Sequence, residues 1–167
     1  MLKWIFSKFF KQPSMVSESR RFNEGEVKVV EAAHKVVFAQ TIICTSVTKR
    51  GLIADPNVVT PWVVGYMVGT LDYATQHILN EPHTDIDIIT LFLETHFLPK
   101  QCKAAMAIFI AVQHAMQSGD DLFVSGADYI EGAKAGYQQF DEDFKAEHQM
   151  PLTVALMNSG YPKKANA

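Results

Sequence analysis

Proline and glycine residues divide this sequence into segments of helical length, and this division restricts the fold more than any other feature. Thr60 followed by Pro61 pairs an N-cap residue with a proline at the first helical position, which predicts a helix over residues 61–80. A second helix beginning near Pro99 ends at Gly119, because glycine readily adopts the left-handed conformation that follows a helix. No stretch alternates polar and apolar residues for long enough to predict a strand.

Capping residues place the other helix boundaries. Asn23 and Glu26 have the spacing of a capping box, which predicts a helix that runs to about Lys49. Thr84 with Asp87 predicts the cap of a helix that stops before Pro99. Two further helices are expected over residues 120–148 and 151–160. The sequence therefore predicts an all-α fold, a single helical bundle of five to six helices over residues 24–160, with a flexible tail at 161–167.

The segment KAAMAIFIAVQHAM, residues 103–116, is apolar around its whole circumference. A helix of this kind is typical of the buried centre of a bundle, so we expect its His114 to be a core histidine. Glycines also lie four residues apart in two segments, a spacing that lets helix backbones approach closely. These pairs are Gly65 with Gly69 and Gly132 with Gly136, and the segments around them share no further register that would indicate a repeat.

Composition predicts one globular domain with an uneven charge distribution. The 167 residues are 48% hydrophobic and 20% charged, which is too apolar for disorder. The net charge of -3 divides into +4 for residues 1–21, with five basic residues against one glutamate, and therefore -7 for the rest. An acidic body disfavours nucleic acid as a partner. Cys44 and Cys102 lie in apolar stretches without metal-binding spacing, which favours buried free thiols.

Residues 1–12 predict a separable N-terminal amphipathic helix, followed by a polar linker at 13–23. On a helical wheel its large apolar side chains occupy one half and its lysines the other, with Trp4 among the lysines. A helix this short is not stable alone in water, so its apolar face needs something to bind. The residues expected to contact a membrane or a partner are Leu2, Lys3, Trp4, Ile5, Phe6, Lys8, Phe9, Phe10 and Lys11.

The apolar face of this N-terminal segment has several candidate binding partners. A membrane interface with anionic lipid suits phenylalanines beside lysines and is the preferred interpretation. A groove on another protein, a second copy of this chain, or the chain's own bundle remain alternatives. A removable targeting segment is disfavoured, because lysines interrupt the apolar run and its first twelve residues contain no arginine.

Few side chains in the sequence suggest chemistry. Glu31 and His34 have the i, i+3 spacing of di-iron bundles, but no second Glu-x-x-His exists, so they are weak metal candidates and an ion pair is simpler. Glu94 and His96 are two apart and point to different sides of a helix. The sequence contains neither a nucleophile elbow nor a phosphate-binding glycine loop. We therefore expect no catalytic residue, no bound metal and no cofactor.

Four hydrogen-bonding side chains form a stripe along the helix predicted at 61–80. Their spacing of three or four residues places them on one face, where they would line a polar pocket or a helix–helix contact. A partly exposed face, with tyrosines covering the edge of the core, is the simpler alternative. The stripe consists of Tyr66, Thr70, Tyr73 and His77.

These observations predict a non-enzymatic adaptor or scaffold, cytoplasmic and peripheral to a membrane through its N-terminal helix, with protein partners on the bundle. One alternative is a ligand- or metal-binding helical protein, with or without enzymatic activity, that uses histidine, glutamate and tyrosine on the bundle helices. Another is a homo-oligomeric structural protein with exchanged N-terminal helices. No segment reaches the roughly 20 apolar residues of a membrane-spanning helix.

Overall fold

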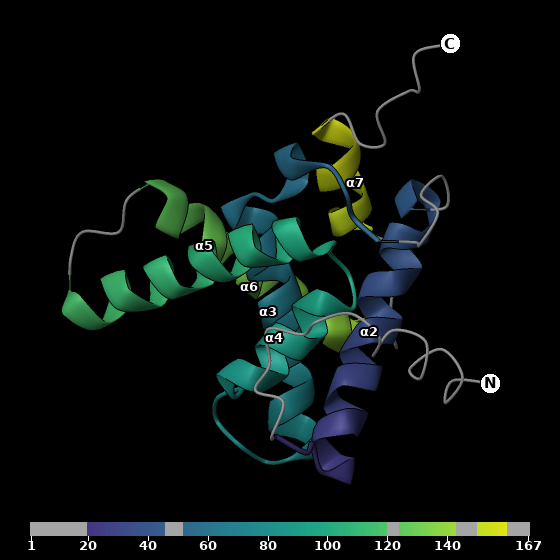
Figure 1. Ribbon diagram of the computed structural model, residues 1–167, viewed down its shortest axis with the longest axis vertical. Coiled ribbons are helices and arrows are strands. Elements are labelled where there is room, and N and C mark those ends of the chain that lie inside the picture. The colour runs from purple at the N-terminus through teal and green to yellow at the C-terminus, as the bar shows by residue number, and fades with distance from the viewer. Residues whose placement is uncertain (1–19, 46–51, 120–123, 143–149, 160–167) are drawn as a thin grey trace.

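A computed structural model of the chain describes residues 20–45, 52–119, 124–142 and 150–159 (Figure 1). The predicted N-terminal helix, residues 1–12, lies outside the described residues, as do most of the linker at 13–23 and the tail at 161–167. The described residues belong to the bundle and to the end of the linker that precedes it.

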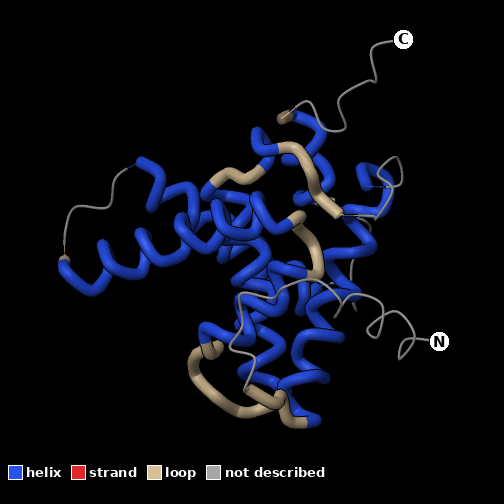
Figure 2. The backbone as a smooth tube through the Cα atoms, viewed as in Figure 1, coloured by secondary structure: helices blue, strands red, loops and turns tan. Residues whose placement is uncertain are grey.

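Within these ranges the fold is all-α, as predicted, with six α-helices and a short 3-10 helix (Figure 2). The elements are α2 (Glu24–Thr45), η1 (Pro56–Val58), α3 (Pro61–Ile78), α4 (Ile86–Glu94), α5 (Pro99–Ser118), α6 (Val124–Glu142) and α7 (Pro151–Asn158). The described ranges contain no strand, although Ile53 and Phe97 form an isolated parallel bridge. This bridge ties the segment before η1 to the segment between α4 and α5.

The predicted caps of three helices are confirmed. Asn23 and Glu26 form a reciprocal capping box, in which the Glu26 amide donates to Asn23 Oδ1 at 2.9 Å and the Asn23 amide donates to Glu26 Oε2 at 2.7 Å. Thr60 caps α3 by accepting a hydrogen bond from the Val63 amide. Gly119 ends α5 with a φ of 67°, the left-handed conformation that favours glycine there.

The predicted cap of α4 was wrong. Asp85 rather than Thr84 caps this helix, accepting from the Asp87 amide at 2.8 Å. The Thr84 hydroxyl instead lies 2.5 Å from Asp72 Oδ1 and 2.8 Å from the Thr75 hydroxyl, both on α3. The Thr84 side chain therefore makes a tertiary contact with α3 instead of the predicted helix cap.

The centre of the bundle is α3, and the prediction that residues 103–116 form it was wrong. Every residue of α3 from Val63 to Leu71 is buried. By contrast α5 buries one face and exposes about half of the Ile110 and Met116 side chains, 52% each. Figure 1 shows α5 projecting from the body of the molecule. The exposed positions of α5 include several alanines, which raise the apolar count of a helix without requiring burial.

The two glycine pairs meet each other, and they bring α3 and α6 into backbone contact. A Cβ atom placed on Gly69 would lie 2.0 Å from the Ala133 carbonyl oxygen, and one on Gly136 would lie 2.0 Å from that of Tyr66. Gly65 and Gly132 repeat the arrangement at 2.1 Å, facing the carbonyl oxygens of Tyr129 and Trp62. In each case a glycine faces the carbonyl that lies three residues before a glycine of the other helix.

The order of these contacts gives the direction of the two helices. Trp62 faces Gly132 and Tyr66 faces Gly136, so residue numbers rise together along both helices and α3 runs parallel to α6. Backbone contact at this distance is open only to glycine, because any other residue carries a Cβ atom. The two glycine pairs in the sequence thus mark the surfaces along which α3 and α6 contact each other.

Candidate functional site

The polar stripe on α3 is divided between the interior of the bundle and its surface. Tyr66 and Thr70 are fully buried, whereas Tyr73 is partly buried and His77 is exposed. The Thr70 hydroxyl donates to the Tyr66 carbonyl at 2.9 Å and lies 3.3 Å from the Gly136 carbonyl of α6. Thr70 thus takes part in the close contact between α3 and α6.

Gln40 of α2 connects Tyr66 to α7 through a buried network. Its side-chain nitrogen Nε2 donates to the Tyr66 phenol oxygen, and its Oε1 accepts from the Leu152 amide at 2.9 Å. The Thr153 hydroxyl donates to the Gln40 carbonyl at 2.5 Å. The first amides of a helix have no partner within it, so Gln40 both caps α7 and joins three helices.

Tyr73 and His77 lie at the outer end of α3, against α6. Their rings stack with centroids 3.8 Å apart, and His77 Nδ1 donates to the Tyr73 carbonyl at 2.8 Å. Tyr137 of α6 meets Tyr73 edge-on at 4.9 Å and donates its hydroxyl to Gln76 Oε1 at 2.7 Å. This aromatic and polar contact continues the α3–α6 interface toward solvent.

The Glu31–His34 pair does not assemble with further ligating side chains. Among the described residues no group of three or more histidine, cysteine, aspartate or glutamate side chains is placed to hold a metal ion. His34 instead lies against the ring of His96, which follows α4, with ring centroids 5.0 Å apart. Burial lowers the pKa of His34, and the Glu31 carboxylate partly opposes that shift.

His96 is a buried histidine that sequence reasoning missed. Only 4% of its surface is exposed, and burial lowers its pKa well below the usual value. The spacing from Glu94 carries no signal. The ring of His96 instead contacts His34 of α2 and, edge-on at 4.9 Å, Phe92 one turn earlier on α4. The chain between α2 and α4 separates His34 from His96 in the sequence, so no local pattern could pair these two histidines.

Two other predictions about burial had opposite outcomes. Cys102 is a free, fully buried cysteine as predicted, and burial raises the pKa of its thiol to about 12. The Cys44 side chain lies outside the described residues. His114 is exposed rather than buried in the core.

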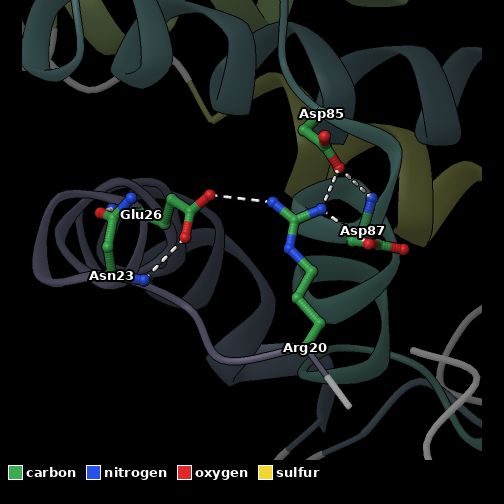
Figure 3. A network of polar contacts seen from close by, with 5 residues as sticks. All are labelled: Arg20, Asn23, Glu26, Asp85 and Asp87. Atoms are coloured by element: carbon green, nitrogen blue, oxygen red, sulfur yellow. Dashed lines mark hydrogen bonds and ion pairs between the residues drawn. The ribbon is translucent and has the colours of Figure 1, made fainter. Parts of the chain in front are cut away.

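Arg20 binds three carboxylates where the chain enters the bundle (Figure 3). Its guanidinium lies 2.7 Å from Asp85 Oδ1, 2.6 Å from Asp87 Oδ2 and 2.8 Å from Glu26 Oε1. Figure 3 shows that these groups converge on Arg20 from α2 and from the start of α4. We call these four residues the Arg20 network. The hydrogen bond between Arg20 and Asp87 contributes most to raising the pKa of Arg20 above its ordinary value.

The Arg20 network fixes the position of the described chain just before α2. Glu26 Oε1 binds Arg20 while its Oε2 accepts from the Asn23 amide, so one side chain serves both the ion pair and the helix cap. The Arg20 guanidinium also lies 5.2 Å from the centre of the Phe22 ring. A charged network with several partners holds its geometry better than one exposed ion pair.

Comparison with known proteins adds no assignment. No protein-family model, no curated protein and no solved structure matches the chain. Among the helices that the structure describes, none is both long and apolar enough to cross a membrane.

Proposed function

We propose that this protein is a non-enzymatic adaptor or scaffold that attaches to the cytoplasmic surface of an anionic membrane through residues 1–12. The observation that carries the proposal comes from the sequence: on a helical wheel of residues 1–12, the phenylalanines occupy one half and the lysines the other. Burial of each large apolar side chain is worth about 1.5–3 kcal/mol, and each lysine near anionic lipid adds about 1 kcal/mol. The cost of ordering the segment offsets part of this, so the attachment is reversible.

The exposed apolar side chains of the described bundle support a role in binding other proteins. Apolar side chains are exposed on two helices that pack together, α2 and α7. Phe38 and Ile42 are 41% and 44% exposed, and Val154 and Met157 are 55% and 58% exposed. Such side chains are suited to contacts with protein partners. The Arg20 network holds the start of α2 in place, so a bound N-terminal segment would hold the bundle close to the membrane.

The proposal is tested with the full chain and vesicles of two compositions, one neutral and one with anionic phospholipid. Replacing Phe6, Phe9 and Phe10 by serine is expected to weaken binding at least about 100-fold, since each buried ring contributes more than 1 kcal/mol. Replacing Lys3, Lys8 and Lys11 by serine is expected to cost about 100-fold on anionic vesicles and little on neutral ones.

The matched control is the double substitution of Val154 and Met157 by serine, which removes exposed apolar side chains from α7 and should leave vesicle binding unchanged. Light scattering without lipid measures the oligomeric state of the same samples. If the phenylalanine variant binds vesicles as tightly as the parent, the membrane role is wrong. If that variant dissociates a parent oligomer instead, the exchanged-helix alternative takes its place.

A further inference from the structure

His34, which is half-buried, and His96, which is buried, form a histidine pair at the contact between α2 and the end of α4. Their ring centroids lie 5.0 Å apart with the planes 32° apart, and aromatic rings lie on both sides of the pair. Phe38 stacks on His34 at 5.4 Å and Phe92 meets His96 edge-on at 4.9 Å. The described ring contacts of the pair are thus aromatic on both sides, with Phe92 buried and Phe38 41% exposed.

Each ring of the pair has a nitrogen atom that is buried and has no hydrogen-bond partner among the residues that the structure describes. These atoms are His34 Nδ1 and His96 Nε2. A buried polar atom without a partner lowers stability, and a protonated ring would add a charge to the same apolar site. The neutral form of both rings is therefore the one that the closed bundle accepts.

The charged groups around the pair do little to accommodate a proton. Among the described residues, Glu31 on α2 favours protonated His34, but burial outweighs it and the pKa of His34 is lowered. His34 itself disfavours protonation of His96, because two positive rings in contact repel each other. The Glu94 carboxylate, two residues before His96, adds to the effect of burial in raising the pKa of the Cys102 thiol on α5.

We infer that the His34–His96 pair is a proton-sensitive contact that holds α2 against α4 near neutral pH and releases it on acidification. When the contact between α2 and α4 opens, both histidine rings can take up protons in water. When the contact is closed, both rings stay neutral. Residues 20–23 lead directly into α2, and the inner face of α2 buries Val29, Val30 and Val37. Release of this contact would uncover apolar surface on α2.

The sign of the pH dependence follows from the two protonation states. An unfolded or opened chain binds protons at these histidines with the ordinary pKa of 6.5, whereas the closed bundle binds them only at lower pH. Between these values the open state holds more protons, so it gains population as pH falls. The closed bundle has its full stability above about pH 6.5. Below that pH, each histidine raises the ratio of open to closed protein by up to about tenfold per pH unit.

The experiment follows the imidazole resonances of the full chain by NMR from pH 7.5 to 5.0, with urea unfolding at the same pH values. His34 and His96 are expected to resist protonation below pH 6.5, the ordinary pKa of histidine. The open or unfolded fraction of the parent should rise more than tenfold from pH 7 to 5.5. Phenylalanine in place of both histidines keeps the aromatic stack but binds no proton, so the H34F/H96F variant should lose that dependence.

The control H114F replaces an exposed histidine and should keep the pH dependence of the parent. If the double variant unfolds, the titration of the parent still decides. An ordinary midpoint near 6.5 for both His34 and His96 in the folded spectrum would overturn the inference. The same slope of stability against pH in the parent and in a folded double variant would overturn it equally.

Discussion

Replacing Gly69 by alanine is expected to lower the free energy of unfolding by about 3 kcal/mol or more, measured by urea denaturation. The new Cβ atom would lie 2.0 Å from the Ala133 carbonyl oxygen, so the two helices must separate along their contact. The obstacle is backbone rather than the end of a flexible side chain, and no rotamer change can relieve it. Adding Gly136→Ala is expected to prevent folding.

Gly25→Ala is the matched control for this prediction, because it also introduces one methyl group into a helix. Its Cβ atom would meet the end of the Leu79 side chain at 2.6 Å, and that side chain can move. Alanine also gains about 0.5–1 kcal/mol over glycine within a helix, which offsets the adjustment. A G69A protein as stable as the G25A protein would show that α3 and α6 do not cross at these glycines.

Replacing Gln40 by leucine is expected to destabilise the protein by about 2–4 kcal/mol, since buried groups that lose their partner cost about 1–3 kcal/mol each. Tyr66 loses its hydrogen bond to Gln40 Nε2, and the Leu152 amide loses its acceptor at the start of α7. The measurement is urea denaturation, combined with proteolysis to detect early release of α7.

A double-mutant cycle distinguishes loss of the network from a local packing effect. Gln40→Leu with Tyr66→Phe should cost less than the sum of the single changes, because each removes the same hydrogen bond. Gln117→Leu on the exposed side of α5 is the control and should leave the midpoint unchanged. Strict additivity of Gln40→Leu and Tyr66→Phe would contradict the network.

Local chemistry made much of the fold predictable from the sequence. The Asn23–Glu26 capping box, the Thr60 cap and the Gly119 terminus depend on residues within one helical turn, and all three are confirmed. The α4 cap was missed because Thr84 binds Asp72, a residue that tertiary structure brings to it. Short-range patterns thus place most helix boundaries, and contacts between elements move the remainder.

The packing order of the helices was less predictable. Residues 103–116 and α3 are both apolar, but much of the first is alanine, which fits an exposed helix face, whereas α3 carries large side chains on every side. The glycine spacing was visible in two segments, yet nothing local indicated that the two pairs face each other. The His34–His96 pair was invisible for the same reason, since its members belong to separate elements.

The central claim is that membrane attachment belongs to residues 1–12 and that the bundle folds without them. A chain that begins at Ser14 keeps Arg20 and its three carboxylates, so its urea midpoint should equal that of the parent. Co-sedimentation of both chains with anionic vesicles is the most direct measurement. We expect the full chain to sediment with the vesicles and the shortened chain to stay in the supernatant. Equal sedimentation of two folded chains would contradict the claim.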